Sequence, residues 1–273
     1  MRALRLAADL VSAVGLSTAA LLLQSSYSND LMDPYLIGTL SGAMAALSAA
    51  VAALGVRVLA SFSSYLAAFL GATVPGLVTA AVALTRGKFA SFVMGLSLTL
   101  ALQGLASVLA YVAAAKSGLP LLPMLLGTTQ YASEETLKWS SFVVALSWLY
   151  SIKIYSKVSL MEYPEGFPES FSVPENSVLT RVLLVSALSS SAVVACCGVL
   201  PFLGLMGGIV GRRLSPPGSR KALFLSNLSS FVIMSFADFV ANSFETPYGF
   251  LPVGSLLSLI GGIAVALLVA KEI

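Results

Sequence analysis

The chain has 273 residues, of which 58% are hydrophobic and only 10% charged, with a formal net charge of +3 and a mean hydropathy of +0.93. Because a soluble domain has roughly a quarter of its residues charged, this composition excludes an ordinary soluble protein and predicts a polytopic membrane protein. The apolar runs are continuous stretches of Leu, Ala, Val, Gly and Ser, without the alternation of a β-barrel. The expected fold class is therefore all-α, a bundle of transmembrane helices.

Charges, Gly/Pro clusters and length divide the chain into about nine expected spans, which form a single transmembrane domain over residues 1–273. The least obvious division falls between residues 182 and 211, where 30 uncharged residues are too many for one ordinary helix and too few for two full crossings. Because Gly198 and Pro201 can end one helix and begin another, we expect a full helix followed by a short one after Pro201. The expected spans lie near residues 6–23, 37–56, 62–84, 90–113, 137–155, 179–198, 202–214, 222–243 and 251–270.

The placement of Lys and Arg does not choose the topology. With nine spans and the amino terminus outside, ten basic residues lie inside and five outside. The same split results if residues 182–211 form one long span and the amino terminus is inside. The two solutions differ in the location of the segment 159–178, which carries four Glu and three Pro and is cytoplasmic only in the first.

Two carboxylates stand out within the expected spans. Asp238 is expected near the middle of its span, where an ionised group is costly, so it either hydrogen-bonds helix ends within the bundle or serves ion coupling. Asp9 is expected closer to the external interface. Because the two carboxylates would then lie at different depths, an intramembrane enzyme with a facing carboxylate pair is a weak alternative.

Motifs for cofactors and metals are missing from the sequence. There is no His, and the two cysteines, Cys196 and Cys197, are neighbours that point in different directions on a helix. We therefore expect no metal site and no disulfide. No G-x-x-x-x-G-K-[ST] motif occurs, so this chain lacks the phosphate-binding loop that would hold ATP, and no cofactor is expected in it.

Three GxxxG spacings are expected to mark places where helix backbones approach closely, because small residues then share one helix face. They are Gly38–Gly42, Gly204–Gly208 and Gly207–Gly211.

Three blocks of sequence carry a resemblance to a known family. "LLLQSSYSNDLMDPYLIGTLSGA", residues 21–43, is similar to the pattern LxGxxxQxxxxNPLADPxxLGxxSGA, and "GVLPFLGLMGGIVGRRL", residues 198–214, is similar to GxIGFVGLIVPHIxRLL. "ADFVANSFETPYGFLPVGSLLSLIGGIAVALLVAKE", residues 237–272, resembles the carboxyl-terminal block of the same family. The family is the FecCD-type permease subunits of type II ABC importers, which carry iron siderophores, cobalamin, haem and related metal complexes.

The resemblance implies a multi-pass permease subunit of the cell membrane, with a cytoplasmic carboxyl terminus and no enzymatic activity of its own. The implied partners are a second copy of the chain, two cytoplasmic ATPase subunits that bind ATP, an external substrate-binding protein and the lipid bilayer, with no nucleic acid. The alternative is an ion-coupled secondary transporter without ATPase partners, for which only Asp238 is well placed.

The resemblance also assigns roles to residues at the two membrane faces. Arg2 and Arg5 match external arginines that pair with glutamates of the binding protein, and Asn242 stands where the family has a further external Arg. The cytoplasmic gate of the family falls on Asn29, Leu31, Lys88 and Phe89. A turn rich in Asn, Asp and Pro is also what any tight connection needs.

The acidic segment 159–178 matches the two short coupling helices that seat in a cleft of the ATPase. The candidate contact residues in it are Glu165, Phe167, Glu169, Phe171 and Val173. The four-residue spacing of its two Phe could place both rings on one face of a short helix, which the prolines limit to a turn or two. The alternative is a solvated acidic linker.

Family members have ten helices, and the chain resembles them from the second helix onward. We therefore expect that the gene starts upstream of Met1. The chain also departs from the family at Gly207–Gly208, where the pattern has Pro-His, and at Asn29–Asp30–Leu31, where it has Asn-Pro-Leu.

Overall fold

The structure is a computed structural model that describes residues 2–117, 122–130, 132–163, 167–171, 173–216, 218–246 and 249–272. Within these residues the fold is all-α, as expected, and nine helices have 12 residues or more. They are α1 (Arg2–Tyr27), α2 (Thr39–Leu54), α3 (Phe62–Arg86), α4 (Lys88–Ser117), α6 (Glu134–Val158), α8 (Glu175–Cys197), α9 (Leu203–Leu214), α10 (Lys221–Ser243) and α11 (Val253–Glu272).

These nine helices correspond one by one to the expected spans. The long apolar run breaks after Cys197 and resumes at Leu203, so the prediction of a full helix and a short one is confirmed and the single long span is wrong. Among the described helices, α1, α3, α4, α8 and α10 are long and apolar enough to cross a membrane by length and composition. The remaining elements are η1 (Val56–Ala60), α5 (Leu122–Leu125), η2 (Ser159–Glu162), α7 (Phe167–Ser170) and the antiparallel pair β1 (Glu245–Thr246) and β2 (Gly249–Phe250).

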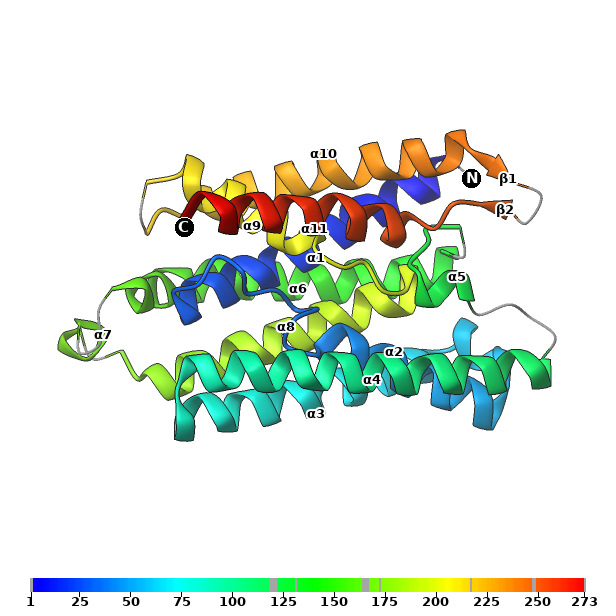
Figure 1. Ribbon diagram of the computed structural model, residues 1–273, viewed down its shortest axis with the longest axis horizontal. Helices are drawn as coiled ribbons and strands as arrows, with labels where there is room; N and C mark the ends of the chain where they lie inside the picture. The colour runs from blue at the N-terminus through cyan, green and yellow to red at the C-terminus, as the bar shows by residue number, and fades with distance from the viewer. Residues whose placement is uncertain are drawn as a thin grey trace.

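The helices run along the long axis of the molecule in three layers (Figure 1). α1 lies in the middle and packs against α6, α8, α9 and α10, while α2 packs against α3, α4 and α8. The apolar windows of α1 and α8 are 72% and 78% buried, whereas that of α4 is only 17% buried. α1 and α8 are therefore the central helices, and α4 presents most of its surface outward.

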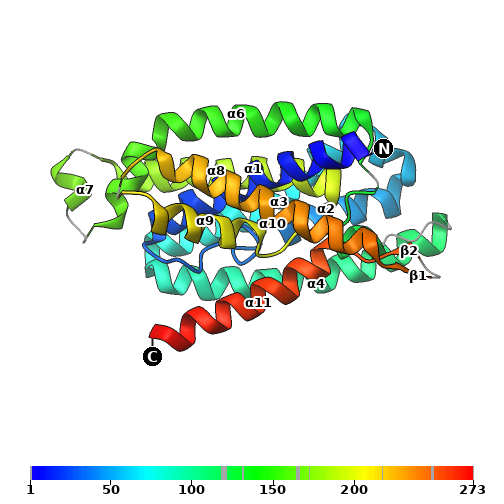
Figure 2. The same ribbon diagram turned by 90° about the horizontal axis from the view of Figure 1, so that it is seen from above.

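The two ends of the bundle differ in charge. One end gathers the end of α1, the turn between α3 and α4, η2, α7, the start of α10 and the end of α11 (Figures 1 and 2). We call it the basic end, because it carries ten of the fifteen Lys and Arg residues: Arg86, Lys88, Lys153, Lys157, Arg181, Arg212, Arg213, Arg220, Lys221 and Lys271. The opposite end holds the other five: Arg2, Arg5, Arg57, Lys116 and Lys138.

Three interrupted segments meet inside the bundle and complete one another's backbone hydrogen bonds. The N–H of Thr128 donates to the carbonyl of Cys197 (2.8 Å), that of Val199 to Met124 (3.2 Å) and that of Gly254 to Gly127 (3.1 Å). Because an unpaired backbone group costs several kcal/mol in hydrocarbon, these bonds allow helices to end within the bundle. We call residues 124–128, 197–199 and 254 the glycine junction.

Glycine is required at the junction for two reasons. Gly127 and Gly198 have φ of +75° and +73°, a left-handed conformation that side chains disfavour. A Cβ atom on Gly127 would also lie 2.1 Å from the carbonyl oxygen of Val199, and one on Gly254 would lie 2.3 Å from that of Leu126. The backbones therefore touch at a distance that only glycine allows.

With one exception, the glycines of the GxxxG spacings lie at close contacts between helices, as predicted. A Cβ on Gly42 would lie 2.2 Å from the carbonyl oxygen of Gly71 in α3, and one on Gly204 would lie 2.5 Å from that of Leu16 in α1. The prediction is wrong for Gly38, which precedes α2 with a φ of +86° and therefore forms no helix face with Gly42.

Replacing Gly127 by Ala will destabilise the protein by about 2–4 kcal/mol, because it adds backbone strain to a clash with Val199. The matched control is Gly104→Ala in α4, where a Cβ would meet nothing within 4 Å and the higher helix propensity of Ala adds stability. Thermal unfolding in detergent measures both variants. Equal melting temperatures for the two would contradict the role of the junction.

Candidate functional site

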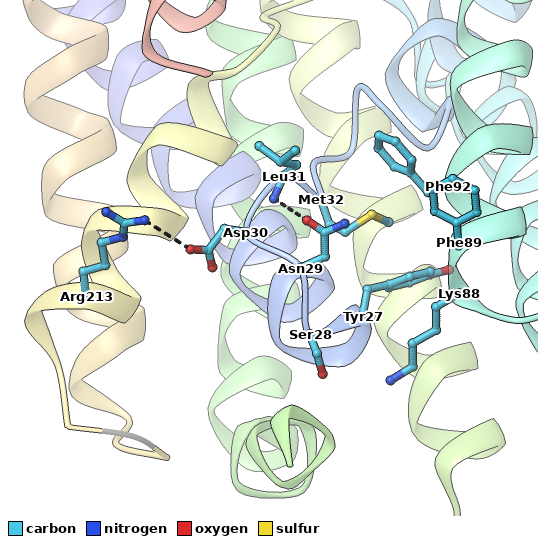
Figure 3. A pocket seen from close by; sticks show the side chains of 10 residues that line it. All are labelled: Tyr27, Ser28, Asn29, Asp30, Leu31, Met32, Lys88, Phe89, Phe92 and Arg213. Atoms are coloured by element: carbon cyan, nitrogen blue, oxygen red, sulfur yellow. Dashed lines mark hydrogen bonds and ion pairs between the residues drawn. The ribbon is translucent and has the colours of Figure 1, made fainter. Parts of the chain in front are cut away.

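A cavity at the basic end lies between the segment that follows α1 and the start of α4. Its volume is about 490 Å³. Figure 3 shows its lining side chains, and all four residues expected at the gate are among them. The lining residues are Tyr27, Ser28, Asn29, Asp30, Leu31, Met32, Lys88, Phe89, Phe92 and Arg213. We call this cavity the basic-end pocket.

Asn29 shapes the loop that forms one wall of this pocket. Its side-chain Oδ1 accepts a hydrogen bond from the backbone N–H of Leu31 (2.9 Å), and its own N–H donates to the carbonyl of Gln24 (3.0 Å). Such an Asx turn is a stable way to end a helix and reverse the chain. Asn29 therefore serves the turn and also fixes where Leu31 lies, while the gate role of both residues stays a prediction.

Lys88 and Phe89 form the other wall, at the first turn of α4. The side chain of Phe89 is 81% exposed, and it also lines a groove of about 740 Å³ between α3 and α4. The pocket is therefore continuous with the outward surface of α4 at this residue.

Charged residues from three segments meet beside the pocket. Arg212, in the last turn of α9, forms ion pairs with Asp30 (Nη1 to Oδ1, 2.7 Å) and with Glu162 of η2 (Nε to Oε1, 3.5 Å). Arg213 lies 3.7 Å from the other oxygen of Asp30. We call these four residues the Arg212 cluster. Sequence reasoning missed it, although two arginines at the end of a helix match the negative end of the helix dipole.

Asp33 lies deeper in the same connecting segment and is 1% exposed. Burial raises the pKa of its carboxyl to about 7, although the hydrogen bond from the backbone N–H of Tyr35 (3.0 Å) acts in the opposite direction. The segment that follows the gate residues therefore contains a carboxyl that is partly protonated near neutral pH.

The segment expected to contact an ATPase contains two short helical pieces, η2 and α7, and α7 projects beyond the bundle at the basic end (Figures 1 and 2). Glu165 lies outside the described residues. Phe167 and Glu169 belong to the single turn of α7, but the description does not extend to their side chains. Phe171 follows α7 and is 60% exposed, whereas Val173 is buried.

The opposite end holds the residues expected to dock a binding protein. The guanidinium of Arg5 donates to the Oδ1 atom of Asn242, so α1 and α10 are tied together there. Arg2 begins α1, and its side chain is outside the described part of the chain. Arg5 and Asn242 are thus neighbours, while their docking role stays a prediction.

Asp9 and Asp238 lie at the same depth, which corrects the sequence-based expectation. Both line one cavity of about 520 Å³ at the opposite end, where α1 and α10 run antiparallel. Asp238 lies five residues from the end of α10 rather than near its middle, and Asp9 lies seven residues into α1, because α1 starts earlier than expected. Asp238 also accepts a hydrogen bond from the hydroxyl of Thr129 (2.5 Å).

Comparison with known protein families assigns the chain to one of them. The model of the FecCD transport family matches residues 1–271. The chain belongs to the FecCD transport family. It is therefore a membrane transport permease, as the resemblance implied.

Two curated relatives illustrate the family. The chain is 27% identical to the probable iron chelatin transport system permease protein of Helicobacter pylori strain J99, over 92% of this chain and 76% of that protein. It is 25% identical to the hemin transport system permease protein HmuU of Yersinia pestis, over 90% of this chain and 75% of that protein.

A solved structure confirms the permease fold. A structure described as an inward-facing conformation of a metal-chelate type ABC transporter matches with a TM-score of 0.85 at 21% identity, covering 99% of this chain and 86% of that chain. PsaBC from Streptococcus pneumoniae, in complex with Fab, matches with a TM-score of 0.60 at 16% identity, covering 94% of this chain and 87% of that chain.

Replacing Asp33 by Asn will stabilise the protein at about pH 8 and change it little at about pH 4. A carboxyl with a raised pKa keeps its proton in the folded protein where the unfolded chain has lost it, so stability falls as the pH rises from about 4 to about 7. Asparagine is neutral throughout and keeps an oxygen for the Tyr35 N–H. The gain at high pH is on the order of a few kcal/mol.

Melting temperatures of both proteins across this pH range measure the effect. A difference between them that is constant with pH would contradict the assignment.

Proposed function

We propose that this protein is the membrane-spanning permease of an ATP-driven importer for a metal chelate such as an iron siderophore, cobalamin or haem. The observation that carries the proposal is the family match along nearly the whole chain. The names of relatives, which include iron chelatin and hemin permeases, support the substrate class.

The proposed orientation places the basic end in the cytoplasm. Ten of the fifteen Lys and Arg residues lie at that end, and cytoplasmic segments carry an excess of these residues. The break between α8 and α9 supports the nine-helix topology, in which segment 159–178 and the carboxyl terminus lie at the same end of the bundle. Both are then cytoplasmic.

A separate ATPase is proposed to dock at the basic end. The sequence has no phosphate-binding loop, so the nucleotide must be held by a partner. α7 projects from the bundle and is followed by the exposed ring of Phe171, which offers an apolar contact for a cleft in that partner. ATP binding then acts through differential affinity for two states of the permease.

A second copy and an external binding protein complete the proposed assembly. α4 is mostly exposed along an apolar surface, which suits contact with another copy around a shared path. At the opposite end Arg5 is engaged by Asn242, so a glutamate of a binding protein would compete with that amide for the guanidinium. The competition favours weak, reversible docking there.

The deciding experiment measures uptake into proteoliposomes that contain this chain together with a candidate ATPase subunit. Uptake of a chelate presented by its binding protein should require ATP on the side of the basic end. Uptake that proceeds with an ion gradient and no ATPase would overturn the proposal.

An ion-coupled secondary transporter is the second candidate, because Asp9 and Asp238 share one cavity. Paired carboxylates within a membrane are the usual carriers of a coupling ion. The same proteoliposomes separate the two functions, since Asp9→Asn would abolish gradient-driven uptake and leave ATP-driven uptake intact.

Replacing Phe171 by Asp will uncouple the ATPase from transport, because it places a charge where the partner's cleft would take an apolar ring. The permease should still insert and melt normally, since Phe171 is 60% exposed. Phe244, equally exposed but at the opposite end, provides the matched control Phe244→Asp. Substrate-stimulated ATP hydrolysis is the measurement, and equal loss in both variants would contradict the docking site.

A further inference from the structure

The Arg212 cluster joins two segments that lie 132 residues apart in the chain, Asp30 after α1 and Glu162 in η2. Arg212 contacts each through a different nitrogen of its guanidinium, Nη1 for Asp30 and Nε for Glu162. The planar, multiply donating guanidinium can hold two carboxylates at once, which the single ammonium of Lys does less well. One cation therefore connects the wall of the basic-end pocket to the segment proposed to contact the ATPase.

A hydrogen bond beside the cluster joins the same two segments. The hydroxyl of Ser28 donates to the backbone carbonyl of Met161 (2.8 Å), and α1 packs against η2 at this point. Two connections, the Ser28–Met161 hydrogen bond and the Arg212 ion pairs, therefore link η2 to residues 28–30.

α9 holds Arg212 in place through close backbone contacts. A Cβ on Gly208 would lie 2.4 Å from the side chain of Gln24, and one on Gly211 would lie 2.6 Å from the carbonyl of Ala222. α9 is thus packed tightly against α1 and α10 up to the residue before Arg212. Arg212 therefore has a fixed position between the loop after α1 and η2.

Arg213 offers a natural comparison. Its side chain is 54% exposed and lies 3.7 Å from Asp30, whereas that of Arg212 is 20% exposed and makes the shorter contact. Exposed ion pairs contribute little because water screens them. Arg212, rather than Arg213, is therefore the residue that links the loop after α1 to η2.

We propose that Arg212 is a positioning residue that transmits movement of η2 and α7 to the gate loop at residues 28–31, an inference that rests on the proposed ATP-driven function. When the ATPase displaces η2, the contact between Arg212 and Glu162 changes. The contact between Arg212 and Asp30 then strengthens or weakens in response. Asp30 lies between Asn29 and Leu31, so the wall of the pocket moves with it (Figure 3). A cavity of about 190 Å³ beside Asp30, Glu162 and Arg212 leaves room for this rearrangement.

The test uses the complete transporter in proteoliposomes and measures substrate taken up per ATP hydrolysed. Arg212→Gln should lower this ratio about tenfold while hydrolysis continues, and Arg212→Lys should have an intermediate effect. Arg220→Gln, at an exposed position directly before α10, is the control and should leave the ratio within about twofold of the unsubstituted protein.

Isosteric substitutions test the pairing itself. Asp30→Asn and Glu162→Gln should each lower the ratio, and Glu162→Gln should add nothing in the Arg212→Gln background, because the shared partner is already gone.

The outcomes separate the inference from the function on which it rests. If the unsubstituted complex shows no ATP-dependent uptake, the proposed function fails. If it transports and Arg212→Gln leaves the uptake ratio unchanged, Arg212 is not the link. Should Arg212→Gln fail to fold, Asp30→Asn and Glu162→Gln decide: a normal ratio in both overturns the inference.

Discussion

The bundle depends on the pairing of backbone groups where helices are broken inside it. A chain in hydrocarbon cannot leave N–H and carbonyl groups unpaired, so a helix can end at mid-depth only if another broken segment meets it. The glycine junction supplies such a meeting, since residues after α5, after α8 and at the start of α11 exchange hydrogen bonds across contacts that exclude a Cβ. This junction allows α9 to start inside the bundle and to reach the basic end within 12 residues.

The short α9 in turn fixes the geometry of the basic end. It packs on α1 and α10 through glycines, and its last turn delivers Arg212 between the loop after α1 and η2. The loop after α1 is itself irregular but internally bonded, because Asn29 and Asp33 accept hydrogen bonds from backbone N–H groups two residues later. Part of the hydrogen bonding of this loop is therefore satisfied within the loop itself.

Much of this fold follows from the sequence, because hydrophobic run length and Gly/Pro punctuation are local signals. The nine helices, the break after Cys197 and the close approach at Gly42 and Gly204 are all of this kind. Contacts between distant segments are not local, and they account for the errors and omissions. The depth of Asp238 depended on where two antiparallel helices end, and the Arg212 cluster depended on three segments meeting in space. Gly38 was misplaced because GxxxG spacing marks a face only if both residues are helical.

Asp238, near the end opposite the basic end, is linked by hydrogen bonds to the glycine junction. Its carboxylate accepts a hydrogen bond from Thr129, and the neighbouring Thr128 donates its N–H to Cys197 at the glycine junction. The carboxylate therefore holds the segment that enters the junction from α5. An ion carrier must release and rebind its ion, and that exchange would disturb a bond on which the helix break depends. The geometry thus favours a structural role for Asp238, and it leaves Asp9, whose Oδ1 has no hydrogen-bond partner within the described part of the chain, as the carboxylate of the pair that is open to other chemistry.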